Sequence, residues 1–192
     1  IAWEDILAPE LQYLYLGTAL IRCEFSETYN TKKGTTVIAD YAFNNSNDAK
    51  VIGLPDSLKG IGDYAFADCS KLGDVTISKN VKYVGKNAFH SKVVMIGYIG
   101  TPAEESAKEN GNQFYPLNYK GLYQIYGDWY YMGDGGIDES FTGLVKHTDD
   151  KWYYVNEGMV DKSYTGLVKH TNGKWYHINE GVVVFNYTGL SK

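Results

Sequence analysis

The side chains best suited to contact a ligand are aromatic rings in the last third of the chain. Trp129, Trp152 and Trp175 follow one another at 23-residue steps, and tyrosines flank each of them. An aromatic face can attract a cation, and it can equally fill a hydrophobic core. Both roles stay open at this stage: the rings pack between repeats, or they pack and also touch a ligand. The candidate ligand-binding residues are Trp129, Tyr131, Trp152, Tyr154, Trp175 and Tyr176.

Other reactive residue types do not combine into a site. His147 and His170 are 23 residues apart and could pair on a metal, but no cysteine or carboxylate stands at ligand spacing beside them. We therefore expect exposed histidines at strand ends, with no metal and no cofactor. The acid pairs Glu104-Glu105 and Asp149-Asp150 are adjacent in sequence, whereas glycosidase chemistry needs two carboxyls set apart across a pocket.

Motifs and charge exclude several classes of function. The chain holds no G-x-S-x-G, P-loop, G-x-G-x-x-G or H-E-x-x-H motif, so we predict no catalytic residues and no enzyme. With 18 basic and 23 acidic residues, the net charge of −5 argues against nucleic acid and anionic membranes as partners. The longest apolar run, residues 93–96, is too short to insert into a membrane.

The aromatic residues lie within a repeat that predicts β-hairpins. Thr-Gly-Leu-Val-Lys-His-Thr begins at Thr142 and again at Thr165, and a Trp-Tyr segment follows each copy. Each unit predicts two short strands, and Asn172-Gly173 between them is a strong hairpin signal. We expect units starting near residues 120, 142, 165 and 188.

This half resembles the cell-wall-binding repeats of choline-binding type, T-G-W-x-x-x-x-G-x-W-Y-Y-x-x-x-x-G. The match covers residues 120–192 and includes Trp152, Tyr153 and Tyr154. The resemblance implies a solenoid of β-hairpins that binds a cell-wall polymer or carbohydrate. In that family the Trp of T-G-W helps to cage the choline ammonium, and leucine, which has no π face, replaces it here. These leucines are Leu122, Leu144, Leu167 and Leu190.

A different 23-residue repeat fills the first half. Residues 38–43, 61–66 and 84–89 share an Ile/Val-x-x-x-Ala-Phe pattern, and residues 15–20 form a weaker copy. Short x-Ile-x-Leu strands lie between the copies, and such coils bury their apolar faces by stacking into a solenoid. The outward positions of these strands form a candidate protein-binding sheet. They are Val51, Gly53, Asp74, Thr76, Met95 and Gly97.

Residues 61–72 read I-G-x-x-A-F-x-x-C-x-x-L, and the half from about residue 11 to 118 resembles the BspA-type leucine-rich repeats of bacterial surface proteins. The stretch 93–117 resembles the closing segment of that family. Independently of the family, Thr101 as N-cap, Pro102 at N1 and Asn110-Gly111 as a stop predict a capping helix over about 102–110.

Cys23 and Cys69 each lie three residues after the last residue of a repeat motif, so we assign them to the same position two repeats apart. Coils stacked at about 4.8 Å would separate them by about 10 Å. A disulfide needs its two α-carbons within about 7 Å of each other. We therefore predict two free, buried thiols.

The predicted fold is mainly β, with a leucine-rich-repeat solenoid over residues 1–118 and hairpin repeats over 119–192. The junction is expected between Pro116 and Lys120. The resemblances imply a secreted or cell-wall-associated bacterial protein, in which the hairpins anchor to the wall and the first half binds a host or bacterial surface protein. The alternative is a structural spacer or accessory module of a larger secreted protein or enzyme. The chain starts at Ile1 with no visible signal peptide, so we expect a mature or excised product.

Overall fold

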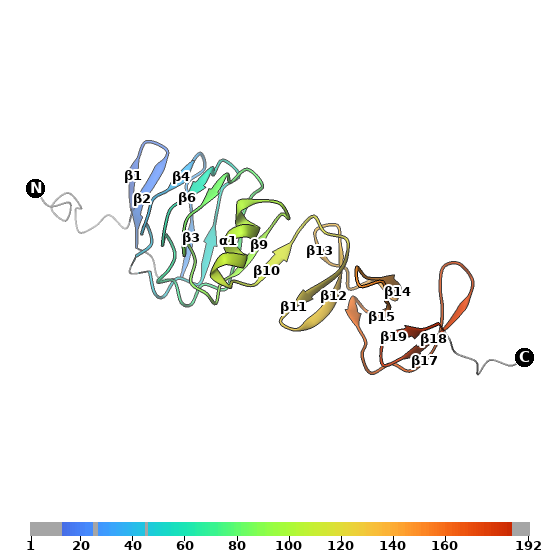
Figure 1. Ribbon diagram of the computed structural model, residues 1–192. Helices are drawn as coiled ribbons and strands as arrows, with labels where there is room; N and C mark the ends of the chain where they lie inside the picture. The colour runs from blue at the N-terminus through green and yellow to red at the C-terminus, as the bar shows by residue number, and fades with distance from the viewer. Residues whose placement is uncertain (1–12, 25–26, 45, 186–192) are drawn as a thin grey trace, which may run out of the picture. The chain divides into compact units, whose positions relative to one another are not determined.

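The computed structural model describes residues 13–24, 27–44 and 46–185 (Figure 1). These residues are mainly β strand, with one short helix, α1. The chain divides between Pro116 and Leu117 into two compact units, an N-terminal half and a C-terminal half. Each half is described by itself.

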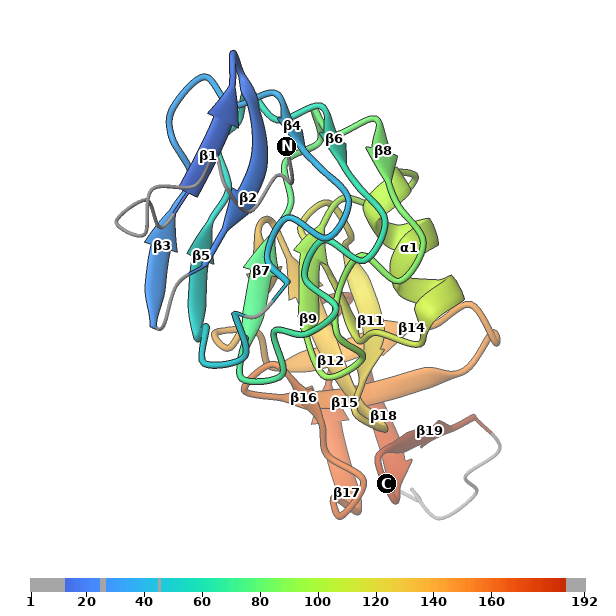
Figure 2. The ribbon, with the colours of Figure 1, turned by 90° about the vertical axis from the view of Figure 1, so that its left-hand side faces the viewer.

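The N-terminal half is a solenoid whose coils place short strands on two faces (Figure 2). One sheet has the strand order β1-β2-β4-β6-β8. A second sheet orders as β10-β9-β7, and β3 pairs with β5. Within the described residues of this half, pairings between coils are parallel, and only the first hairpin, β1 with β2, is antiparallel. The strands are β1 Tyr13–Leu16, β2 Ala19–Cys23, β3 Thr28–Asn30, β4 Val37–Ile38, β5 Val51–Gly53, β6 Gly60–Ile61, β7 Asp74–Thr76, β8 Tyr83–Val84, β9 Val94–Gly97 and β10 Phe114–Pro116.

Aromatic rings at the repeat period form the centre of this solenoid. Phe43, Phe66 and Phe89 stack in a column, with ring centroids 4.4 Å and 5.0 Å apart. Ile38 and Ile61 are fully buried beside them. Burial of each such side chain stabilises the fold by about 1.5–3 kcal/mol. The 23-residue spacing places these side chains in one continuous core.

The first coil departs from the predicted repeat. Leu20 pairs with Ile38 across β2 and β4, so Leu20 lies in the isoleucine column and the assignment of residues 15–20 as a copy in register with Phe43 is wrong. The antiparallel turn from β1 into β2 replaces part of a coil. As a result, the step from Leu20 to Ile38 is shorter than 23 residues.

The two cysteines therefore occupy different columns. The Cys23 N–H donates to Ala42 O just as the Phe43 N–H donates to Ala65 O, so Cys23 lies in the phenylalanine column. Cys69 follows Phe66 as Ser46 follows Phe43, with equivalent backbone bonds, so the assignment of the cysteines to one position is wrong. Both thiols are nevertheless buried and free. Burial raises the pKa of Cys23 to about 11 and that of Cys69 to about 12.

The helix α1, Pro102–Asn110, packs against β8, β9 and β10. Pro102 begins it, and Gly111 ends it in the left-handed region at φ 72°, where its N–H bonds to Ala107 O. Thr101 stands at the N-cap, but its hydroxyl donates to Tyr98 O instead of capping the helix. Glu104 accepts from the Gly100 N–H at 2.7 Å, which favours the same start.

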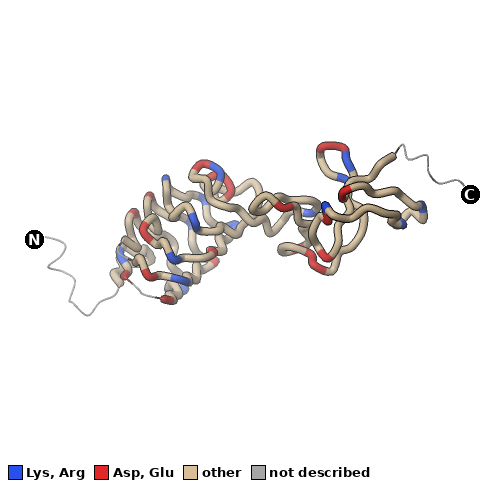
Figure 3. Tube along the Cα trace, turned by 90° about the horizontal axis from the view of Figure 1, so that it is seen from below, with Lys and Arg blue, Asp and Glu red and all other residues tan. Residues whose placement is uncertain are grey.

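The surface of the N-terminal half carries interleaved charges, with neighbouring blue and red segments along the coils (Figure 3). Lys50 pairs with Glu27 and Lys71 with Asp48, each across one 23-residue step. Both pairs are exposed, and exposed pairs contribute about 0–1 kcal/mol. The buried rings and not these charges therefore set the stability of the stack.

The described residues of the C-terminal half form three similar units, each with three strands where the sequence predicts two. In the second and third units the short third strand also pairs back onto the unit before it: Met159 of β16 lies opposite Tyr130, and Val182 of β19 lies opposite Tyr153. The expected unit start near 188, with Leu190, lies outside the described residues. The first unit contains β11 Gly121–Ile125, β12 Asp128–Gly133 and β13 Gly136–Ile137; the second β14 Gly143–Lys146, β15 Trp152–Asn156 and β16 Met159–Val160; the third β17 Gly166–Lys169, β18 Trp175–Asn179 and β19 Val182–Val184.

Two tight turns hold neighbouring units together. Glu157-Gly158 and Glu180-Gly181 have positive φ at both residues, which is the geometry of a two-residue type I′ hairpin turn. A Cβ added to Gly158 would lie 2.8 Å from Asp138 O, and one added to Gly181 would lie 2.6 Å from Asp161 O. These glycines are required by their backbone angles and by close contact with the preceding unit.

Candidate ligand site between hairpin units

Side chains alternate along the second strand of each unit, so neighbouring rings point to opposite sides of that strand. Tyr153 and Val155 of β15 pack toward the first unit, whereas Trp152 and Tyr154 pack toward the third. We call the packing of the second unit on the first the first junction, and that of the third unit on the second the second junction. Each junction buries a small apolar core, Leu122, Val155 and Val160 in the first and Leu144, Ile178 and Val183 in the second.

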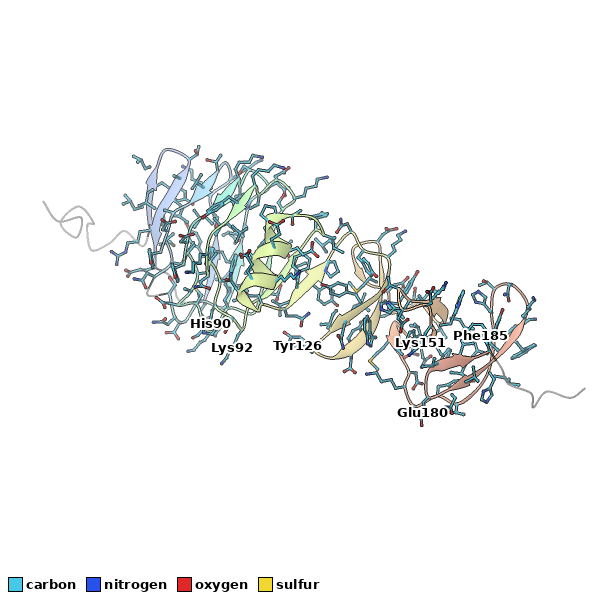
Figure 4. The ribbon with its side chains drawn as sticks, viewed as in Figure 1. His90, Lys92, Tyr126, Lys151, Glu180 and Phe185 are labelled. Carbon is cyan, nitrogen blue, oxygen red and sulfur yellow. The ribbon has the colours of Figure 1, made fainter. Side chains whose placement is uncertain are left out.

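The second junction contains a hollow of about 90 Å³. The His170 ring meets Trp152 at 5.2 Å and Tyr176 at 6.0 Å between centroids, both edge-on. Phe185, labelled in Figure 4, follows β19, and its ring lies 6.2 Å from that of Tyr176. The lining residues are Leu144, Trp152, His170, Asn172, Tyr176, Val183 and Phe185.

Hydrogen bonds orient the polar groups of the hollow. Asn172 Nδ2 donates to the Tyr176 hydroxyl at 2.9 Å, and Asn172 Oδ1 accepts from the Lys174 N–H. Because the Tyr176 hydroxyl accepts this bond, its own proton is available to a ligand. The loop is a three-residue hairpin connection with Gly173 at φ 81°, so Asn172-Gly173 does mark the hairpin.

The first junction repeats the rings with different charges around them. His147 lies 4.6 Å from Trp129, as His170 lies beside Trp152. Asp149 replaces Asn172 and accepts the Tyr153 hydroxyl proton at 2.7 Å. This bond lowers the pKa of Asp149, and burial together with the bond raises the pKa of Tyr153 to about 12. Lys162 replaces Phe185 and pairs with Asp128 at 3.3 Å.

The structure brings together only some of the predicted ligand residues. Trp152 and Tyr176 line the hollow, and Trp129 lies in the first junction. Tyr131 stacks on Phe141 at 3.9 Å between ring centroids, and Tyr154 lies tilted against Tyr164 at 4.4 Å, so both pack between units. Trp175 is 58% exposed on the outer side of the third unit, away from the hollow.

Sequence reasoning missed several residues of the hollow. The expectation that His147 and His170 are exposed is wrong, since both are half-buried against tryptophan. In the sequence Asn172 indicates only a turn, and Phe185 has no equivalent aromatic in the other units. Asn172 and Phe185 each lie 23 residues after a first-junction residue, Asp149 and Lys162. This repeat spacing is the sequence signal that could have identified them.

The predicted protein-binding sheet is only partly exposed. Val51, Asp74 and Thr76 point outward and are exposed, whereas Asn30 covers Gly53. Met95 and Gly97 are buried, so their prediction as surface residues is wrong. The register places Val75 opposite Met95, because the step from β7 to β9 is 20 residues and not the 21 that a two-residue deletion implies. The outward residues of β9 are Val94 and Ile96.

Among the described residues, no group of three or more histidine, cysteine or acidic side chains could hold a metal ion. Nor does any helix in that part of the chain have the length and apolar character to cross a membrane. In the described part of the chain, the second-junction hollow joins aromatic rings to polar groups, and it is our candidate ligand site.

Comparison with family models agrees with this architecture. Residues 18–105 match the BspA type leucine rich repeat region in six copies, and residues 140–161 and 163–184 each match the choline-binding repeat. The chain thus carries BspA-type leucine-rich repeats followed by choline-binding repeats, the layout that the sequence predicts. Both repeat types are typical of cell-surface proteins, in protein-interaction or wall-binding modules. Searches of curated proteins and of solved structures returned no match.

Proposed function

We propose that this chain is a non-catalytic adhesion and interaction module of a secreted bacterial surface protein. The hairpin units hold a cell-wall polymer, and the leucine-rich half presents a protein-binding sheet. The observation that carries this proposal is the second-junction hollow, where Trp152, Tyr176 and Phe185 place aromatic rings beside polar groups. Such a hollow between repeats is the kind of concave, largely apolar site that small ligands occupy.

The second candidate function is that of a structural spacer or accessory module. The exposed sheet favours it, because Val51, Asp74 and Thr76 are small and mixed in character and define no particular partner. A spacer needs the stacked coils and hairpins but not the hollow. The two functions therefore differ in whether Trp152 matters for binding.

The test is sedimentation of the whole chain with purified Gram-positive cell walls, with and without their teichoic acids. We expect the wild-type chain to sediment with walls and Trp152→Ala to remain in solution. Trp175→Ala is the matched control, since it removes an exposed tryptophan outside the hollow. Circular dichroism would establish that both variants are folded. If the wild-type chain stays in solution, or if both variants sediment equally, the hollow is not a wall site and the spacer function is favoured.

A further inference from the structure

The second-junction hollow has chemistry that distinguishes two kinds of wall ligand. A quaternary ammonium is held by several aromatic faces and needs no hydrogen bonds. A neutral sugar needs one aromatic face for its apolar side and several hydrogen-bonding groups for its hydroxyls. The walls of the hollow meet these two sets of requirements unequally.

Three aromatic rings line the hollow, but two other features of its wall disfavour a cation. Leu144 stands in its wall and offers no π face. None of its lining residues is a carboxylate, so no opposite charge compensates an ammonium for lost hydration.

The same hollow is well equipped for hydroxyl groups. The Tyr176 hydroxyl accepts from Asn172 and keeps a proton to donate. Asn172 has a second amide hydrogen to donate, and the His170 imidazole also lines the hollow. Trp152 provides the broad ring against which an apolar sugar face can lie.

The first junction lacks this combination. Tyr153 donates its proton to Asp149, so the equivalent hydroxyl is already used. Lys162 and Asp128 form an ion pair where the second junction has the Phe185 ring. A neutral ligand would have to compete with these charged contacts, so the two junctions are not equivalent sites.

We propose that the second junction binds a neutral sugar unit of the wall polymer, and not its choline. The sugar stacks on Trp152 and exchanges hydrogen bonds with Tyr176, Asn172 and His170. This inference rests on the proposed function, since it names the ligand class of the same site.

The test uses the whole chain and the sedimentation assay with three additions: choline chloride as competitor, N-acetylglucosamine oligosaccharides as competitor, and walls oxidised with periodate, which cleaves sugar diols and spares choline. We expect choline to leave binding unchanged. The oligosaccharides or the oxidation should reduce it. Tyr176→Phe keeps the ring and removes one hydrogen bond, so it should weaken binding about fivefold. Tyr153→Phe is the matched control in the first junction and should bind like the wild type.

The outcomes separate this inference from the proposed function. If walls bind and choline competes, or if neither oligosaccharide nor oxidation has an effect, the sugar assignment is wrong while wall binding stands. Equal binding by Tyr176→Phe and the wild type would also overturn it. If the wild-type chain binds no walls at all, the proposed function fails together with the inference.

Discussion

The two halves of the chain share a 23-residue step but bury it in different ways. In the N-terminal half, Phe43, Phe66 and Phe89 stack inside one continuous core. In the C-terminal half, two small cores alternate with half-buried rings such as Trp152 and Tyr176. A coil closes around its own interior, whereas a hairpin has two faces and shares each with a neighbour. The first half therefore contains most of the buried core that stabilises the chain. The second half leaves aromatic ring surface available to a ligand.

The largest effect should come from breaking the phenylalanine column. Phe66→Ala removes a fully buried ring that stacks on both neighbours. The free energy of unfolding of the N-terminal half should therefore fall by about 3–5 kcal/mol. Urea denaturation followed by circular dichroism measures this. Phe185→Ala, at a ring that is 63% exposed, should cost less than about 1 kcal/mol. Equal losses would contradict the contrast between the halves.

A smaller effect should follow from disturbing the turn that joins two hairpin units. Gly158→Ala meets both an unfavourable φ of 78° and the Asp138 carbonyl oxygen, so we expect a loss of about 2–3 kcal/mol. Gly173→Ala is the control, because its φ is also positive but nothing lies within 4 Å, and should cost about 1 kcal/mol. Thermal denaturation of both variants measures the two losses of stability. If Gly173→Ala destabilises the protein as much as Gly158→Ala, close packing between units is not the cause.

Alkaline pH should weaken the N-terminal half through its thiols. Burial raises the pKa of Cys69 from 9.0 to about 12, so its contribution is complete below pH 9 and is lost as the pH rises toward 12. The loss can reach about 1.4 kcal/mol per pH unit. Denaturation at pH 8 and pH 10.5 should show a larger difference for the wild type than for Cys69→Ala. Identical pH dependence in the two proteins would mean that the thiol is ionised alike in both states.

The smallest expected effect concerns the contrast between sugar and choline. Leu144→Trp adds a ring to the wall of the second junction, and a cation–π contact of about 0.5–2 kcal/mol should raise choline affinity about 2- to 30-fold. Calorimetric titration with choline chloride measures it. Leu167→Trp, at the equivalent and 40% exposed position of the third unit, is the control and should gain little. If Leu144→Trp does not raise the affinity for choline, the side chain at position 144 does not face the ligand.

Much of the fold is readable from local sequence because its signals are short-range. The repeated Ala-Phe pair predicts the buried column, since an apolar residue at every turn has to meet its copy. Pro102 and Gly111 stand at the two ends of α1, because one cannot donate a helical hydrogen bond and the other adopts the left-handed region readily. Asn172-Gly173 marks its hairpin in the same way.

Long-range pairing settled the rest. Met95 is inside because β9 aligns with β7 one residue away from the expected register, and a shift of one residue exchanges the two faces of a strand. The third strands of the second and third units, β16 and β19, are too short to read in sequence, and each pairs with two units at once. The candidate site depends on the same kind of contact: His170, Asn172 and Phe185 become neighbours of Trp152 only when the third unit packs on the second.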